Sequence, residues 1–344
     1  MANTVGLNNA HTDYFLIEKI FNQLSSSVSI ALMKKGRLSY EFYGGKHFNS
    51  RGSDSHISRR TRFNIGTASM PITGSLIVKL MEFGEMRLND KVKRFIPEFK
   101  FPDIGIFHLL THSSGLVFDG FPQPHNHDSK KAFLKQIYDV DALSYETGSD
   151  SRLFPYGYAI LADIIERVSG QSVEAFASAL VFMPLGMNNT TYSSISLRDD
   201  QYITPWCHKE SRFLTETKHH LSTGFSGIYS TALDMLRFGN MLLNGGEYNG
   251  RQIFLESSAE FIRKEITNNK FMRTPLFMIN AKGNKYGFFS KYQSHDAIAH
   301  TGDTGSLFFI DPPRRSVAAA LTNSTWVNDS SRNYGNICEI LANM

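Results

Sequence analysis

Segments that favour β-strands lie near both ends of this chain, and segments that favour helices fill its middle. Residues 27–45 form two strand-like runs joined by a Lys-Lys-Gly turn, which is a hairpin signal. Residues 286–292, 306–312 and 316–323 are short, apolar and bounded by Gly, Pro or Asn. Strands from both termini pair most simply in one sheet, with the helical region inserted between them. The sequence therefore predicts an α/β (α+β) fold in which an antiparallel sheet from both termini is flanked by helices.

The helical segments are recognised by apolar residues that recur at helical spacing, and several of them end at a glycine. They are expected at residues 14–24, 72–86, 106–116, 157–170, 231–246 and 335–344. No repeat, low-complexity tract or obvious linker divides the chain. We therefore expect a single unit over residues 1–344, with an α/β sheet part at 1–66 and 231–344 and a mainly helical part at about 67–230.

The composition argues against several classes of protein. The chain has 344 residues and a formal net charge of +4, and its basic residues are scattered, so no nucleic-acid partner is expected. No stretch of about 20 apolar residues occurs, so no membrane span is expected. The first residues lack a basic start followed by an apolar run, which argues against a secretory signal and for a cytoplasmic protein. The oligomeric state has no signature in the sequence.

Signals for a metal or a disulfide are weak. The two cysteines lie far apart and outline neither a disulfide framework nor a zinc site. Two histidine pairs, His125 with His127 and His219 with His220, each lack a third ligand within reach along the sequence. We therefore predict no metal and no other cofactor.

The segment around residue 67 has the features of a ligand-facing helix start. Gly66 and Thr67 open a predicted helix, whose free N–H groups and positive dipole end favour an anion or a carbonyl oxygen. Pro71 fits the first turn, because early N–H groups have no helical partner. Residues 67 and 70 are three apart and share one helix face, which is an arrangement that suits a nucleophile and its base.

Several longer blocks occur in a fixed order along the chain. They include RFNIGTASMPITGSLIVKLMEFGEM at 62–86, HLLTHSSGL at 108–116, YGYAILADIIERVSGQSVEAF at 156–176 and HTGDTGSLFFIDP at 300–312. In these blocks the chain resembles the serine β-lactamase and penicillin-binding-protein superfamily, in its class C β-lactamase-like and esterase-like branch. The resemblance implies a β-lactamase/transpeptidase-like fold, and it implies that three motifs carry any acyl-transfer chemistry.

The first motif of the family is Ser-x-x-Lys at the helix start, where the serine attacks and the lysine helps to remove its proton. At the matching positions this chain has Thr67 and Met70. Ser69 does not restore the motif, because Ile72 lies three residues later. Lys79 lies further along and is expected on the polar face of the helix. A threonine hydroxyl is a feasible nucleophile, but methionine offers no base.

The second motif is Tyr-x-Asn, a few residues before the Gly-Tyr of the following helix. The matching positions hold Leu153 and Pro155, and Tyr156 lies close by but out of phase. Loss of several members of a coupled catalytic set removes orders of magnitude in rate. The resemblance therefore argues against β-lactamase and DD-peptidase activity.

The third motif is present as His300-Thr301-Gly302, on a strand that edges the pocket in the family. The amides of Thr67 and Asp303 are then the implied oxyanion donors. Asp303 is unusual there, because a carboxylate opposes developing negative charge unless it points away or is protonated.

Three interpretations of this site remain open. The first is a repurposed intracellular enzyme that acts on a small carbonyl, ester or amide compound, with specialised-metabolite biosynthesis as one setting. The second is a non-catalytic ligand-binding or regulatory pseudoenzyme. The third is a hydrolase or acyltransferase that depends on Thr67. All three take a small molecule as ligand or substrate.

The candidate residues divide into two groups. Catalytic candidates are Thr67, His300, Asp303 and Tyr156, with His300 and Asp303 as a proton-transfer pair. The alternatives for this pair are a strand histidine that serves packing and a solvated turn carboxylate. Substrate-binding candidates are Gly66, Met70, Leu153, Pro155, Thr301 and Gly302, whose apolar members suit a hydrophobic ligand.

Overall fold

A computed structural model describes residues 3–5, 27–47, 55–117, 129–192, 197, 202–207, 209, 212–213, 223–281, 286–325 and 330–344. The helix expected at residues 14–24 lies outside the described residues, as do both histidine pairs considered above.

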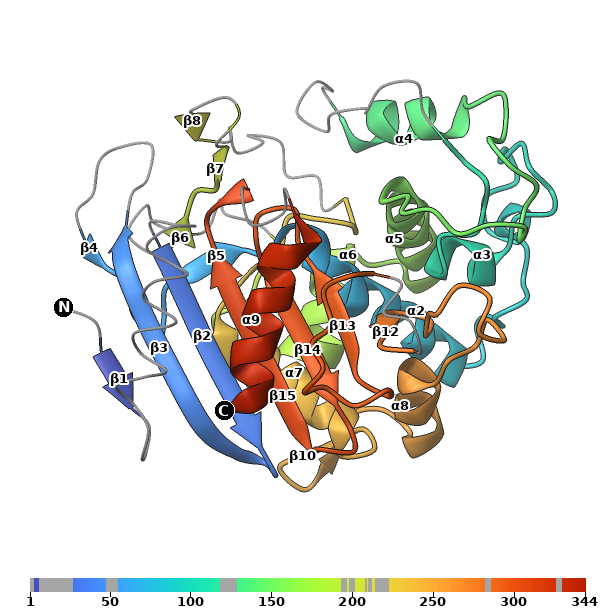
Figure 1. The fold of residues 1–344 in the computed structure, drawn as a ribbon. Helices are drawn as coiled ribbons and strands as arrows, with labels where there is room; N and C mark the ends of the chain where they lie inside the picture. The colour runs from blue at the N-terminus through green and yellow to red at the C-terminus, as the bar shows by residue number, and fades with distance from the viewer. Residues whose placement is uncertain are drawn as a thin grey trace.

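An eight-stranded antiparallel sheet forms the centre of the molecule (Figure 1), and its strands come from both ends of the chain. The order is β1-β3-β2-β15-β14-β13-β12, with β4 paired to β3. The strands are β1 (Asn3–Val5), β2 (Ser27–Lys34), β3 (Arg37–His47), β4 (Ser55–His56), β12 (Met278–Ile279), β13 (Ile298–Thr301), β14 (Leu307–Asp311) and β15 (Ser316–Thr322). The expected fold class is thereby confirmed.

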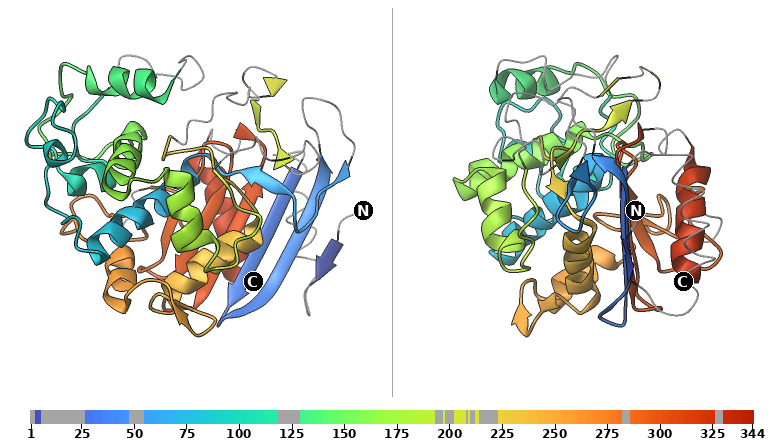
Figure 2. Two further views of the ribbon diagram at one scale, coloured as in Figure 1. Left: turned by 180° about the vertical axis from the view of Figure 1, so that it is seen from behind. Right: turned by 90° about the vertical axis from the view of Figure 1, so that its left-hand side faces the viewer.

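The described helices lie on both faces of the sheet and beyond one of its edges. They are η1 (Gly66–Ser69), α2 (Met70–Glu82), η2 (Val92–Arg94), α3 (Ile106–Leu110), α4 (Lys130–Tyr138), α5 (Tyr156–Ser169), α6 (Val173–Ala177), the π-helical turn η4 (Ser178–Phe182), α7 (Ala232–Leu243), α8 (Glu256–Arg263) and α9 (Ser331–Asn343). The right-hand view of Figure 2 places α9 on one face and α7 with α2 on the other. The green helices α3, α4 and α5 lie towards the β12 edge (Figure 1).

One short three-stranded sheet and two strand pairs lie outside the main sheet in the described part of the chain. They are β5 (Arg62–Asn64) between β6 (Tyr202–Ile203) and β9 (Tyr229–Ser230), β7 (Trp206–Cys207) with β8 (Arg212–Phe213), and β10 (Glu247–Tyr248) with β11 (Arg251–Gln252).

Two hydrophobic cores lie on opposite faces of the sheet. Phe308 belongs to the core on the α7 side and Phe309 to the core under α9, because successive side chains of a strand point to opposite faces. All five residues of β14 are buried, which explains why the first four, LFFI at 307–310, are continuously apolar rather than alternating.

Two local predictions need correction. The apolar run at 286–292 was expected to be a strand, but it has no strand structure, and its Phe288 and Phe289 pack in the α9 core. The sheet edge is formed instead by β12. The helix expected at 106–116 is only the short α3, because the chain turns at His112, whose φ is +55°.

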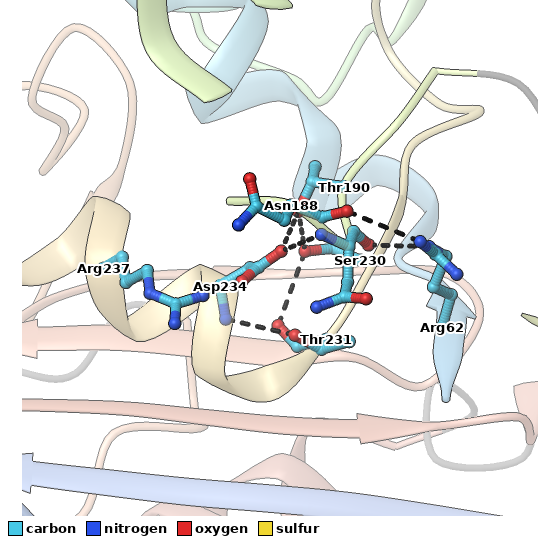
Figure 3. Close-up of polar contacts among 8 residues, drawn as sticks. Arg62, Asn188, Thr190, Ser230, Thr231, Asp234 and Arg237 are labelled. Atoms are coloured by element: carbon cyan, nitrogen blue, oxygen red, sulfur yellow. Dashed lines mark hydrogen bonds and ion pairs between the residues drawn. The ribbon is translucent and has the colours of Figure 1, made fainter. Parts of the chain in front are cut away.

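A buried carboxylate ties β5, the 188–190 turn and α7 together (Figure 3). Asp234 is 0% exposed, pairs with Arg237, and accepts hydrogen bonds from the Asn189 amide at 2.8 Å and the Thr190 hydroxyl at 2.9 Å. Arg62 of β5 donates to the Asn189 carbonyl at 3.1 Å. This junction holds β5, and hence the start of η1 two residues later, against the body of the molecule.

None of the helices in the described part of the chain is both long enough and apolar enough to cross a membrane.

Candidate functional site

The start of η1 meets the end of β13, as the family resemblance implies for the two walls of a site. Gly66 has a φ of +54°, which glycine adopts without strain and other residues rarely adopt. A Cβ on Gly302 would lie 2.2 Å from the Ile65 carbonyl oxygen. Glycine at both positions therefore allows the two backbone segments to approach closely.

A closed set of hydrogen bonds links Thr67 to the turn after β13. The Thr67 amide donates to Asp303 Oδ1 at 2.9 Å, and the Thr67 hydroxyl donates to the Thr301 carbonyl at 3.1 Å. The Asp303 amide in turn donates to Thr67 Oγ1 at 3.3 Å. Both amides that the resemblance implies as oxyanion donors are thus engaged within the protein, and the Thr67 hydroxyl is used as donor and acceptor.

The Asp303 carboxylate lies beside the start of η1, where it accepts the hydrogen bond from the Thr67 amide. Burial is the largest cause that raises its pKa, and the Thr67 amide is the first of several hydrogen-bond donors that oppose this rise. Asp303 is nevertheless solvent-exposed, so the surrounding protein leaves part of the residue in contact with solvent. A Cβ on Gly66 would lie 2.1 Å from Asp303 Oδ1, so glycine is needed to accommodate the carboxylate.

Met70 and Lys79 do not supply a base. Met70 is 0% exposed and belongs to the main hydrophobic core. Lys79 was expected on a polar face, but this is wrong: it is buried, pairs with Glu82 at 2.6 Å and lies 4.5 Å from the centre of the Phe254 ring. Its charge is therefore neutralised away from Thr67.

The segment before α5 has an apolar and aromatic character. Leu153 is 59% exposed, and Pro155 precedes the first turn of α5. Tyr156 is buried, and its ring packs against Phe133, Phe154 and Phe225. Burial raises the pKa of Tyr156 to about 12, so its hydroxyl stays protonated near neutral pH and is a poor general base there.

His300 makes no hydrogen bond to Asp303, the residue with which it was expected to act as a proton-transfer pair. Its Nδ1 lies 2.8 Å from the Thr301 carbonyl oxygen, and its buried Nε2 has no partner. Burial lowers the pKa of His300 to about 4, and the charge of Arg273 contributes to this lowering. The ring is therefore neutral at physiological pH. Sequence reasoning missed Arg273, because nothing in its local sequence marks it as close to residue 300.

Tyr334 of α9 was also missed. Its hydroxyl donates to the Gly302 carbonyl at 2.7 Å, so the C-terminal helix supports the turn that carries Asp303. No group of three or more metal-ligating side chains occurs among the described residues.

A family model described as Beta-lactamase matches residues 17–336, which is most of the chain. The chain belongs to the Beta-lactamase family. The chain is similar to N-acetylmuramyl-L-alanine amidase of Bacillus subtilis, with 22% identity over 347 residues. The match covers 86% of this chain and 76% of that protein.

Two solved structures share the Beta-lactamase fold with this chain. EstCE1, described as a hydrolase with promiscuous acyltransferase activity, matches with a TM-score of 0.76 at 18% identity, covering 96% of this chain and 99% of that one. Simvastatin synthase (LovD) from Aspergillus terreus matches with a TM-score of 0.75 at 13% identity, covering 98% of both chains. At such identities these neighbours show the fold alone.

Proposed function

We propose that this chain is a repurposed member of its family that binds and transforms a small carbonyl, ester or amide compound without a Ser–Lys acyl-enzyme mechanism. Asp303 is the working group in this proposal, and β-lactam hydrolysis and DD-peptidase activity are absent. The observation that carries it is the hydrogen bond between the Thr67 amide and the Asp303 carboxylate. A carboxylate at this position takes a donor that acyl transfer would need for an oxyanion.

Asp303 has the properties of an acid–base group. Its raised pKa brings its proton affinity closer to neutral pH, where a carboxyl group is more effective in proton transfer. Its solvent exposure leaves it open to a ligand. Proton transfer on a bound carbonyl compound, or its cyclisation, fits this arrangement better than hydrolysis, because Thr67 has no base.

Two other candidates rest on specific observations. A non-catalytic ligand-binding role is favoured by the hydrogen bonds of Thr67, because its amide and its hydroxyl are both engaged within the protein and are not free for catalysis. A Thr67-dependent hydrolase or acyltransferase is favoured by the fold shared with EstCE1, a hydrolase with promiscuous acyltransferase activity. An intracellular location remains part of the proposal.

Turnover by matched variants separates these candidates. Purified protein is first denatured and its small-molecule content identified by mass spectrometry, and a panel of esters, amides and ketones related to any retained compound is then assayed. We expect Asp303→Asn to lower turnover by at least about 10-fold, the lower end of what a positioned acid–base group contributes, and Thr67→Val to have a smaller effect.

His300→Ala is the third variant of this series. It tests whether the neutral imidazole of His300 also contributes at least about 10-fold to turnover. Loss of turnover in Thr67→Val alone would support the Thr67-dependent hydrolase instead. A retained ligand that no variant converts would support the binding protein.

A further inference from the structure

Basic residues that lie far apart in the sequence meet at one end of the main sheet, where β2 turns into β3 (lower end in Figure 1). The β2–β3 hairpin carries Lys34, Lys35 and Arg37 at its turn, and the turn between β14 and β15 carries Arg314 and Arg315. The Lys35 amide donates to the Arg315 carbonyl at 2.7 Å, so the two turns lie side by side. These five residues are called the basic patch below.

The strand register places Lys34 at the centre of the basic patch. It pairs with Arg37 on β3 and with Ser316, the neighbour of Arg315, on β15. Residues paired in this way have Cα atoms about 5 Å apart and side chains on the same face of the sheet. Burial and then the charge of Arg314 lower the pKa of Lys34, so the Arg314 side chain is also within electrostatic range. The cations of three neighbouring strands therefore form one patch.

Little acidic charge balances the basic patch. Asp311 Oδ2 lies 3.8 Å from Arg314 Nε, but Asp311 is buried and also accepts hydrogen bonds from the Ser294 amide and hydroxyl at 2.9 and 2.6 Å. No carboxylate of the described residues forms an ion pair with the other four basic side chains. Lys34 is half-buried and the remaining basic residues are exposed. The patch thus presents an unbalanced positive charge to solvent.

An exposed apolar side chain lies among these cations. Leu38 follows Arg37 in the β2–β3 hairpin and is 41% exposed. Binding at a lipid interface combines burial of apolar side chains with attraction of basic ones to anionic headgroups, and the patch offers both. The exposed residues of the two turns, at 35–39 and 313–315, include no aromatic side chain, whereas sites for single-stranded nucleic acid use aromatic rings for stacking.

We propose that the basic patch docks this protein onto the anionic surface of a phospholipid membrane, with Leu38 inserted between the headgroups. Clusters of roughly four to eight lysines and arginines bind such surfaces, because the anionic headgroups attract them. The long basic side chains reach the phosphates while their methylene groups cover apolar surface. Leu38 adds the apolar burial that a purely charged patch lacks.

The basic patch lies at the opposite end of β15 from the candidate site. β15 begins at Ser316, and its last residue, Thr322, donates through its hydroxyl to the Gly305 carbonyl at 3.1 Å, in the turn that carries Asp303. A strand of seven residues spans about 20 Å. Docking at the basic patch therefore does not cover Asp303, and the inference does not depend on the reaction proposed above.

Sedimentation of the full chain with vesicles tests the proposal without any variant. Vesicles of phosphatidylcholine alone are compared at low ionic strength with vesicles that also contain about one-third phosphatidylserine. We expect binding to the mixed vesicles only, and release when sodium chloride is raised to about 0.5 M, because salt screens exposed charges. Binding to neither kind of vesicle, or equal binding to both, would overturn the proposal.

A matched pair of double variants tests whether the basic patch itself is responsible. Lys35→Gln with Arg37→Gln should lower the partition coefficient for the mixed vesicles by at least about 10-fold. Lys93→Gln with Lys131→Gln removes the same charge from exposed lysines of η2 and α4 and should bind nearly as wild type does. An equal loss in both double variants would show that net charge alone attracts the protein, and would overturn the assignment to this patch.

Leu38→Ser distinguishes a membrane from a nucleic acid as the partner, because it keeps every charge of the patch. We expect it to bind the mixed vesicles several-fold more weakly than wild type does, because less apolar surface is buried. Unchanged vesicle binding would contradict the insertion of Leu38. Binding of a fluorescent single-stranded RNA that requires Lys35 and Arg37, without binding of vesicles, would assign the patch to a nucleic acid and overturn the proposal.

Discussion

At the scale of single residues, the position of the Asp303 carboxylate determines which chemistry the site can support. Asp303 accepts a hydrogen bond from the Thr67 amide, and the Asp303 amide donates to the Thr67 hydroxyl. A threonine held in this way has its proton engaged by the Thr301 carbonyl, and no basic side chain of the described residues is hydrogen-bonded to it. Met70 is also fully buried in the hydrophobic core, so a charged side chain at this position would be strongly unfavourable.

Met70→Lys tests how apolar that position is. A fully buried lysine loses up to 3–5 pKa units at 1.36 kcal/mol each, so the free energy of unfolding should fall by about 4 kcal/mol or more at pH 7. The loss should shrink as the pH approaches 10, because the unfolded lysine then releases its proton too. Met70→Leu is the control and should cost less than about 1.5 kcal/mol in urea unfolding. Equal stability of the two variants would mean that position 70 meets solvent.

Asp303→Asn tests the raised pKa of that carboxyl group by its effect on stability. The folded state binds the proton more tightly than the unfolded state, so wild-type stability falls as pH rises through the interval between the unfolded and folded pKa values. Asparagine keeps an oxygen for the Thr67 amide but does not titrate. The variant should therefore gain stability relative to wild type as pH rises through that interval, measured by urea unfolding from pH 3.5 to 7.5. A difference that is constant or shrinks would show that the pKa is not raised.

At the scale of elements, the site depends on segments that are far apart in the sequence. The η1 turn follows β5, which the Asp234 junction fixes to α7, and the facing turn follows β13, which Tyr334 of α9 supports (Figures 1 and 3). Both walls of the site are therefore held by elements outside it.

Asp234→Ala should weaken this support. Removing one partner of a buried, hydrogen-bonded ion pair leaves its donors unsatisfied and destabilises by about 3–5 kcal/mol. The low end applies here, because the Arg237 side chain is 34% exposed and retains some hydration. Asp139→Ala, which removes an exposed carboxylate paired with Lys135 at i,i+4, is the control and should leave the free energy of unfolding nearly unchanged. A similar small change for Asp234→Ala in guanidinium unfolding would show that the junction is dispensable.

At the scale of the whole molecule, the sequence predicts the sheet from both termini because its strand signals are local. The hairpin at 27–45 becomes β2 and β3, and the runs at 306–312 and 316–323 become β14 and β15. The run at 286–292 misleads, because Phe288 and Phe289 are apolar for packing under α9 rather than for strand pairing. A short apolar run does not reveal which of these two contexts applies.

The candidate site is predictable in its backbone but not in the directions of its side chains. The order of motifs places Thr67 next to Thr301, and the structure brings them within hydrogen-bonding distance. Whether the Asp303 carboxylate bonds to the Thr67 amide, and whether His300 bonds to Asp303 or to the Thr301 carbonyl, depends on tertiary contacts that leave no local pattern. The domain boundaries proposed from the sequence remain a prediction.

The central claim is that this family member does not form an acyl-enzyme, and intact-protein mass spectrometry tests it most directly. Wild-type protein and Thr67→Ala are incubated with a fluorescent penicillin, and nitrocefin hydrolysis is followed in parallel. We expect unchanged masses for both proteins and nitrocefin rates that do not differ, because the Thr67 hydroxyl has no base and its amide is engaged by Asp303. A covalent adduct on wild type that is missing from Thr67→Ala, or turnover clearly above that variant, would contradict the account.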